Sequence, residues 1–278
     1  MFEWRNIFKG MTMGVSDLIP GVSGGTIALV LGIYQNLVAA INGLFTKDWK
    51  KHLMFLIPLG TGIVIALLTI SHLIEWLLAE YPQPTFFFFL GLVIGIIPSL
   101  LKEIDYKRNF TNRHYGLLAI GALLVASTFF FKSNELAEVM TSLSFSDYIL
   151  LFFAGWLASS AMILPGVSGS FIFLLFGVYP TVVNALSSFN IPVILTVGAG
   201  IGIGLVLTSK LITFLFERFK IETYAIMIGF IAGSIVVIFP GFTEDHLLSI
   251  GAIILGWMAA KLLSVAENKK TVVKIQNS

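Results

Sequence analysis

The sequence predicts an all-α, polytopic integral membrane protein built from two inverted-topology repeats. Its mean hydropathy of +0.94, with 57% hydrophobic and 12% charged residues, is typical of membrane proteins rather than soluble domains. The apolar stretches are too many and too long to be buried in the core of a 278-residue soluble protein. A helix-breaking motif also occurs twice. Together these observations predict two halves, each with a re-entrant helical hairpin plus three transmembrane helices.

The repeated motif occupies residues 17–34 in the first half and 162–179 in the second. At a constant offset of 145 residues, Pro-Gly-Val-Ser-Gly at 20–24 aligns with the same five residues at 165–169, and a following Gly-x-Tyr also recurs. A second block aligns at an offset of 138 and contains Gly60 with Gly198, Gly62 with Gly200, Gly91 with Gly229 and Gly95 with Gly233. A short third block, Ile120-Gly121-Ala122, aligns at an offset of 130 with Ile250-Gly251-Ala252. We interpret the chain as one unit duplicated.

Hydropathy places the elements of both halves. The first repeat (1–131) contains a hairpin at 7–43 and spans at 53–78, 86–101 and 115–131. A polar connector at 132–146 leads to the second repeat (147–264), with a hairpin at 148–188, spans at 191–216, 224–239 and 247–263, and a polar cytoplasmic tail at 265–278. Residues 7–19 form a limb of only about 20 Å, short of the roughly 30 Å hydrocarbon core. The second limbs are predicted at 25–41 and 169–186, and their lengths leave fully spanning hairpins open.

The basic residues indicate how the halves are oriented. Each half crosses the membrane an odd number of times in either version of the hairpin, so the second half is expected upside down relative to the first. With a cytoplasmic N-terminus that carries no cleaved signal peptide, the positive-inside rule is obeyed. The cytoplasmic segments then hold Arg5, Lys9, Lys47, Lys50, Lys51, Lys102, Lys107, Arg108, Arg113, Arg218, Lys220, Lys261, Lys269, Lys270 and Lys274. Only Lys132 falls outside, and Lys210 lies within a span. Both termini are therefore expected in the cytoplasm.

The duplicated motif predicts an anion-binding site near the membrane midplane. Non-helical backbone at this depth is tolerated only where protein buries it or where it lines a wet cavity. Glycines let the backbone approach a ligand closely, hydroxyls donate hydrogen bonds, and the helix that begins after each motif points its N–H groups at the loop. Two such N-termini meeting from opposite sides would bind an anion without a permanent charge. The predicted binding residues are Gly21, Ser23, Gly24, Gly25, Thr26, Gly166, Ser168, Gly169 and Ser170.

Two other interpretations of the motif are open. Small residues commonly allow close helix packing in membranes, which is how we interpret the scattered glycines outside the motif. Gly21-x-Ser23-x-Gly25 also matches a nucleophile elbow and resembles motifs of intramembrane serine hydrolases. Catalysis is disfavoured because the pattern is duplicated, the second copy lacks the last glycine and the strand-turn-helix context is missing. We therefore predict a protein that is not an enzyme.

Ionisable residues within the predicted membrane segments are further candidates for function. Asp17 precedes the first motif and could carry a proton or orient the hairpin, although Met162 stands in its place in the second copy. His72 and Lys210 occupy equivalent positions, where each could meet a phosphate at its own membrane face or simply be an interfacial or snorkelling side chain. Glu75 lies one turn from His72, could pair with it, and is a second candidate for proton coupling.

Several functions are excluded by residues that the sequence lacks. There is no Cys, so disulfides, thiolate metal sites and thiol redox centres are excluded. No Walker loop, nucleotide fingerprint, carboxylate pair or metal-ligand spacing is present. We therefore expect no cofactor, no metal and no nucleic-acid partner.

The sequence resembles the bacterial polyprenyl-phosphate transporter family of the PopT type, formerly a domain of unknown function. The resemblance rests on GMTMGVSDLIPGVSGGTIALVLGIY at 10–34 and on the second motif at 164–179, and it extends over nearly the whole chain. It implies an undecaprenyl phosphate translocase of the bacterial cytoplasmic membrane, which returns the lipid carrier from the outer to the inner leaflet for peptidoglycan and teichoic acid synthesis. The implied partners are a polyprenyl phosphate and the membrane. Ser170-Phe171 replaces Gly25-Thr26 in the second motif, so the two tips are not expected to bind the headgroup equally.

The resemblance and the motif chemistry agree on an anionic headgroup. In this interpretation the phosphate passes between the paired tips, the polyprenyl tail stays in lipid, and rocking of the two halves alternates access. The main alternative is a transporter or channel for a small soluble anion, which the same hairpins could serve. A greasy lateral opening would favour the lipid, whereas an enclosed polar vestibule would favour the soluble anion. The sequence does not specify the driving force or the oligomeric state, and a homo-oligomer is one of the alternatives.

Overall fold

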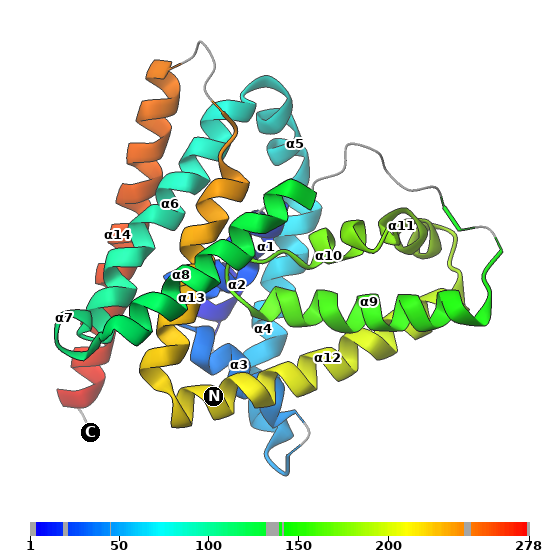
Figure 1. Cartoon of the computed structure of the whole chain (residues 1–278), viewed down its shortest axis with the longest axis horizontal. Coiled ribbons are helices and arrows are strands. Elements are labelled where there is room, and N and C mark those ends of the chain that lie inside the picture. Colours follow the sequence, from blue (N-terminus) through cyan, green and yellow to red (C-terminus); the bar gives the residue numbers. More distant parts are fainter. Residues whose placement is uncertain are drawn as a thin grey trace.

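The computed structural model describes residues 4–18, 22–44, 46–131, 139–140, 142–241 and 246–276, with side chains through 263 apart from that of residue 246. The described residues form helices and the loops between them, and no strand is found among them. Six of these helices are long and apolar enough to cross a membrane. The predicted class, an all-α polytopic membrane protein, is therefore confirmed (Figure 1).

The first half begins with a broken hairpin and continues with longer helices. Its elements are α1 (Arg5–Asp17), α2 (Gly24–Val30), α3 (Tyr34–Gly43), α4 (Trp49–Thr69), α5 (Ser71–Glu80), α6 (Pro82–Glu103), α7 (Tyr106–Asn109), α8 (Asn112–Ser127) and the 3-10 turn Thr128–Phe131. The predicted spans at 86–101 and 115–131 match α6 and α8 with its 3-10 turn to within a few residues. The predicted span at 53–78 is wrong as a single helix, because it breaks at Ile70 between α4 and α5. The break falls in Thr69-Ile70-Ser71, three residues of reduced helix propensity.

The second half has the same order of elements, but the long helix that follows its hairpin is unbroken, unlike α4 and α5 in the first half. Its elements are α9 (Phe145–Ile163), α10 (Gly169–Leu175), α11 (Tyr179–Ser187), α12 (Ile191–Arg218), α13 (Lys220–Ile238) and α14 (His246–Gln276). The predicted spans at 191–216, 224–239 and 247–263 lie within or nearly within α12, α13 and α14. The predicted polar tail at 265–278 is not separate from the last helix, because α14 continues through it as far as residue 276.

The second limb of each hairpin is not the single helix that the sequence predicted. The limb at 25–41 is interrupted between α2 and α3, and the limb at 169–186 is interrupted between α10 and α11. Each break contains a glycine with positive φ, +62° at Gly32 and +67° at Gly177, a conformation that L side chains rarely adopt. The axes of α10 and α11 differ by 113°, as in a broken span or a re-entrant loop. These glycines belong to the recurring Gly-x-Tyr, and their positive φ explains why a glycine recurs at this position.

Glycines allow the hairpin helices to pack closely on the long helix that follows. A Cβ added to Gly10 of α1 would overlap the carbonyl oxygen of Leu59 in α4, and one added to Gly62 would overlap that of Ile7. The second half repeats both contacts, between Gly155 and Val197 and between Gly200 and Phe152. The packing interpretation holds for these glycines. It does not hold for Gly60, Gly198 and Gly202, where an added Cβ would meet nothing within 4 Å.

The last helices of the two halves interlock. α6 of the first half packs on α14 of the second, and α8 packs on α13, so each close pair joins one helix from each half. Gly121 fits against Ile226 in one pair, and Gly256 fits against Phe88 in the other. By these contacts Gly121 corresponds to Gly256, 135 residues later, and not to Gly251 as the offset of 130 predicted. The short third block of sequence identity is therefore out of register with the packing.

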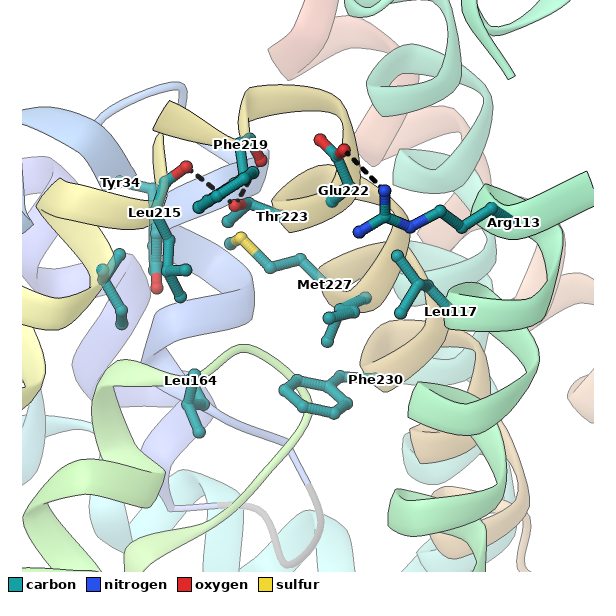
Figure 2. Close-up of a pocket in the computed structure, with 12 residues that line it drawn as sticks. Tyr34, Arg113, Leu117, Leu164, Leu215, Phe219, Glu222, Thr223, Met227 and Phe230 are labelled. Carbon is teal, nitrogen blue, oxygen red and sulfur yellow. Dashed lines mark hydrogen bonds and ion pairs between the residues drawn. The ribbon is translucent and has the colours of Figure 1, made fainter. Parts of the chain in front are cut away.

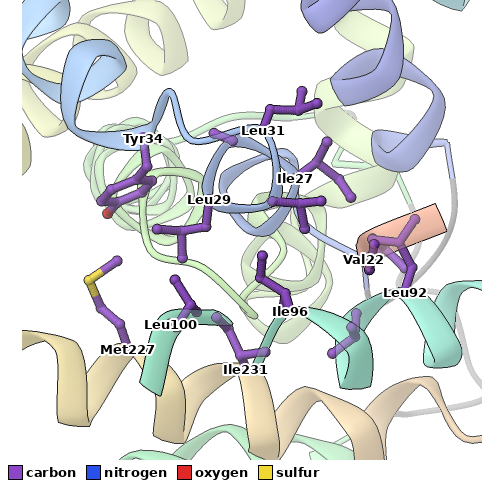
Figure 3. Close-up of a cluster of buried hydrophobic side chains, with 14 of the residues drawn as sticks. Val22, Ile27, Leu29, Leu31, Tyr34, Leu92, Ile96, Leu100, Met227 and Ile231 are labelled. Atoms are coloured by element: carbon purple, nitrogen blue, oxygen red, sulfur yellow. The ribbon is translucent and has the colours of Figure 1, made fainter. Parts of the chain in front are cut away.

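The two hairpins are buried to different degrees. All side chains of α2 are buried, and Val22, Ile27 and Leu29 pack against α6 and α13 in the main core (Figure 3). Within α10 of the second hairpin, by contrast, Gly169 is the one buried residue. A separate, smaller core holds α9, α11 and α12 together. These helices extend to one side of the group formed by α6, α8, α13 and α14 (Figure 1).

Candidate functional site

The tip of the first hairpin is a buried, fully capped helix start. Gly21 lies outside the described residues, as do its two predecessors, so the predicted role of Gly21 stays a prediction. Asp17 precedes these residues and Gly24 follows them, and the carboxylate of Asp17 accepts a 2.8 Å hydrogen bond from the N–H of Gly24. The hydroxyl of Ser23, the N-cap residue, accepts one of 3.2 Å from the N–H of Gly25. Protein groups therefore already satisfy the first N–H groups of α2.

The tip of the second hairpin has no such caps. Ser168 is the N-cap residue of α10, but its side chain accepts no capping hydrogen bond. Its hydroxyl instead lies 2.8 Å from that of Ser170, which is exposed. Met162 stands against Gly169 where Asp17 stands against Gly24, and a thioether is at best a weak acceptor. The two tips therefore differ in their hydrogen bonding: the Ser23 hydroxyl of the first tip caps the backbone, whereas the Ser168 and Ser170 hydroxyls of the second tip pair with each other. Whether the tips bind a headgroup unequally stays a prediction.

The structure brings the two copies of the motif into contact. The N–H of Gly166 donates a buried 2.8 Å hydrogen bond to the hydroxyl of Thr26, 140 residues away in sequence. Gly166 has φ of +83°, and an added Cβ there would meet the backbone of Phe230. At Gly25 an added Cβ would lie 3.0 Å from the carbonyl oxygens at the end of α9. Thr26 and Gly166 thus join the tips, and their polar groups are partly used in doing so.

The other predicted candidates lie apart from the tips. His72 and Glu75 are exposed on α5, and Lys210 is exposed on α12. No hydrogen bond or ion pair between His72 and Glu75 is found among the described residues. None of the three lines the cavity that adjoins the motif. Within the described part of the chain, no group of three or more His, Asp or Glu side chains could hold a metal ion.

A cavity of about 260 Å³ lies beside both motif copies (Figure 2). It reaches Leu164, just before the second Pro-Gly, and Tyr34, the last residue of the first motif. Its charged residues are Arg113, near the start of α8, and Glu222, near the start of α13. The remaining lining is Leu117, Ile212, Leu215, Phe219, Thr223, Ile226, Met227 and Phe230. The cavity is therefore largely apolar, with charges at one side, and it is partly open.

Sequence reasoning missed the polar residues around this cavity. Arg113 was assigned only to a basic loop, and Glu222 to none of the candidate sites. Tyr34 was noted as part of the repeat, and its recurrence as Tyr179 was the one available signal. A second polar group nearby was also missed: the hydroxyl of Tyr224 donates to Glu103 at 2.6 Å and accepts from the amide of Gln35 at 3.2 Å. This chain of contacts links α3, α13 and the end of α6.

Comparison with known proteins places the chain in a family. A family model described as undecaprenyl phosphate translocase-like matches residues 13–252. A polyprenyl-phosphate transporter of Staphylococcus aureus is 42% identical over 280 residues, covering 96% of this chain and 99% of the relative. A polyprenyl-phosphate transporter of Vibrio cholerae is 36% identical over 245 residues, covering 84% of this chain and 76% of the relative. No solved structure matches. The chain belongs to the undecaprenyl phosphate translocase-like family, as its motif predicted.

Proposed function

We propose that the protein is a translocase for undecaprenyl phosphate or a related polyprenyl phosphate. It returns this lipid carrier from the outer to the inner leaflet of the bacterial cytoplasmic membrane, and both of its termini face the cytoplasm. The family description and the names of both relatives support a polyprenyl phosphate as substrate. Those names describe transport and not catalysis, which confirms the prediction of a transporter that is not an enzyme.

The mostly apolar lining of the cavity is the observation that favours a lipid over a soluble anion as the substrate. An enclosed polar vestibule would favour a soluble anion, whereas the cavity found here is mostly apolar and partly open. The apolar side chains of Leu117, Ile226 and Phe230 do not favour a hydrated inorganic anion, which would lose water without gaining hydrogen bonds from them. A phosphate attached to a hydrocarbon tail uses both kinds of lining, because the tail contacts the apolar wall and the headgroup meets the charged side.

The hairpin tips are proposed to hold the headgroup near the membrane midplane. Of the two, the second tip offers the uncommitted hydroxyls of Ser168 and Ser170. The first tip is capped internally by Asp17 and Ser23, which supports the helix-orienting role of Asp17 over proton coupling. His72 and Lys210, exposed on different helices, are proposed headgroup contacts at the two membrane surfaces, and Glu75, exposed on α5, is the remaining candidate for proton coupling.

The arrangement of the chain ends supports the proposed orientation. The N and C labels, α7, and the connection between α12 and α13 all lie in the lower part of Figure 1. These are the segments whose basic residues are expected in the cytoplasm. A single face with both termini and these loops is what two odd-crossing halves of opposite orientation require.

The site assignment is tested in purified proteoliposomes. The leaflet distribution of undecaprenyl phosphate is followed with and without a pH gradient, for the wild type and for Ser23→Ala with Ser168→Ala. We expect the double variant to slow transport at least about tenfold, since the second tip loses a hydroxyl that no backbone group uses and the first tip loses the cap of α2. Unchanged transport in a folded double variant would show that the tips do not bind the headgroup. A rate that ignores the gradient would identify a facilitator rather than a proton-coupled transporter.

A further inference from the structure

Among the residues that the structure describes, the cavity lining includes a loosely paired cation, Arg113, and a buried hydroxyl without a hydrogen-bond partner, that of Tyr34. We propose that the cavity is a docking site for the phosphate of the lipid carrier and that Arg113 is the residue that contacts the phosphate. This inference rests on the proposed function, because it names where the same lipid binds on the side of the α6–α8 and α12–α13 connections.

Arg113 is held only weakly by its protein neighbour. Its guanidinium Nη1 lies 3.9 Å from Oε1 of Glu222, and the two side chains are 72% and 25% exposed. That distance is beyond hydrogen-bond range, and exposed ion pairs of this kind contribute little to stability. A phosphate would instead accept two parallel, charge-assisted hydrogen bonds from the guanidinium. Glu222 therefore acts as an internal competitor that a phosphate can displace.

Glu222 keeps a second neighbour when Arg113 turns to a phosphate. Its Oε1 also lies 3.9 Å from Nε2 of His114. The other ring nitrogen of His114 accepts a 3.0 Å hydrogen bond from the N–H of Thr111, and the ring stacks on Phe110 at 5.4 Å. With Nδ1 used as an acceptor, Nε2 is the donor that faces the carboxylate. The exchange at Arg113 therefore does not leave Glu222 without a polar neighbour.

Tyr34 supplies an independent observation that points to a ligand. Its side chain is only 2% exposed, and its hydroxyl has no hydrogen-bond partner among the described residues. A buried hydroxyl without a partner is costly and usually indicates an absent water or ligand. The ring is fixed edge-on to Phe216 at 6.1 Å, and it lines the cavity on the side opposite Arg113 (Figure 2). The hydroxyl itself is closed off in this structure, so a phosphate oxygen in the cavity becomes its acceptor once the surrounding side chains shift.

The rest of the lining is suited to the carrier's hydrocarbon chain. Leu117, Leu164, Met227 and Phe230 surround the space between Arg113 and Tyr34 (Figure 2). A volume of about 260 Å³ lies at the small end for ligand pockets. The cavity therefore accommodates the phosphate and the adjacent part of the chain, and the remaining tail leaves through the open side into the bilayer.

Binding of farnesyl phosphate to the full-length, detergent-purified protein tests this assignment by calorimetry. Farnesol and inorganic phosphate, titrated separately, distinguish recognition of the chain from recognition of the anion. Arg113→Gln is expected to weaken farnesyl phosphate binding at least about tenfold, and Arg113→Lys to retain part of it, because a Lys cannot form the bidentate contact. Arg108→Gln is the matched control, since Arg108 is exposed on α7 and outside the cavity lining, and it should bind as the wild type does. Glu222→Gln should bind several-fold more tightly because the internal competitor has lost its charge.

The outcomes separate this inference from the proposed function. Equal affinities of folded Arg113→Gln and Arg108→Gln would overturn the role of Arg113, even if the wild type transports undecaprenyl phosphate. Inorganic phosphate binding as tightly as farnesyl phosphate would overturn the assignment of the cavity to a lipid. A wild type that neither binds farnesyl phosphate nor moves undecaprenyl phosphate would instead overturn the proposed function itself. Tyr34→Phe gives a further check, with an expected loss of a few-fold in affinity and a fold left intact.

Discussion

The backbone N–H of Gly166 donates a 2.8 Å hydrogen bond to the hydroxyl of Thr26, so the two copies of the repeated motif are joined tip to tip. The reciprocal bond cannot form, because Phe171 stands where the second copy would need a hydroxyl. The two copies also differ at the start of the helix that follows each motif, where Asp17 caps α2 but Met162 faces α10. A duplicated sequence has thus become one tip whose helix start is buried and capped and one more exposed tip.

Removing the Thr26 hydroxyl should destabilise the fold. Thr26→Val keeps the side-chain shape but leaves the buried N–H of Gly166 unpaired, so the free energy of unfolding should fall by about 1–3 kcal/mol. Thr26→Ser should restore most of it. Thr61→Val is the matched control, since Thr61 is exposed and bonds only to its own helix; its effect should stay below about 0.5 kcal/mol. Denaturation in detergent measures all three, and equal losses for Thr26→Val and Thr61→Val would show that the tip bond is unimportant.

Asp17 should behave as a helix cap and not as a proton carrier. Asp17→Met copies the second motif and removes the acceptor for Gly24, which should lower stability by about 1 kcal/mol. Asp17→Asn keeps an acceptor oxygen, so stability should change little and any response of transport to a pH gradient should persist. A folded Asp17→Asn variant that transports normally but no longer responds to the gradient would assign the coupling proton to this carboxylate.

The serines of the two tips should have different roles. Ser168→Ala with Ser170→Ala removes the uncommitted hydroxyl pair and should slow lipid transport at least about tenfold with little loss of stability. Ser23→Ala removes a buried cap and should mainly lower stability, by about 1 kcal/mol. Ser187→Ala with Ser188→Ala is the control on the same hairpin, where both exposed hydroxyls bond to the helix backbone. Transport that falls equally in both double variants would argue against a special role for the second tip.

Glycines on one helix should fall into two classes. Gly62→Ala should be strongly destabilising, by about 1–3 kcal/mol or more, because the added methyl group would overlap the backbone of α1. Gly60→Ala has open space and should be neutral or stabilising by up to about 1 kcal/mol, through helix propensity. Gly200→Ala and Gly198→Ala should repeat the contrast on α12. Four similar unfolding temperatures would contradict the packing of α1 on α4 and of α9 on α12.

Hydropathy and the repeat predicted much of this architecture. The spans at 86–101, 191–216 and 224–239 correspond to α6, α12 and α13 because a long apolar run has few alternatives to a membrane helix. The breaks at Gly32 and Gly177 were not predicted, although a Gly recurring at the same place in both copies was a usable signal. The break at Ile70 had no counterpart in the other half, so comparison of the repeats could not reveal it.

The cavity could not be derived from the sequence because it is built from distant segments. Arg113 and Glu222 come together only because α8 of one half packs on α13 of the other. The offset of 130 gave the wrong register for the last helices, so this exchange between halves was not foreseen. The contact of Thr26 with Gly166 likewise depends on how two hairpins meet, which no local pattern encodes. Predictions of site residues were therefore confined to the motif and to single ionisable residues such as His72, Glu75 and Lys210, none of which lines the cavity.

Movement of undecaprenyl phosphate between the leaflets of proteoliposomes containing the wild-type protein is the most direct test of the proposed function. The lipid is placed in one leaflet, and its appearance in the other is followed against protein-free liposomes and against vesicles containing folded Ser168→Ala with Ser170→Ala. We predict rapid, protein-dependent movement that the double variant slows and that inorganic phosphate in excess does not abolish. No movement above the protein-free rate, from correctly folded and inserted protein that admits a soluble anion instead, would contradict a lipid-phosphate translocase.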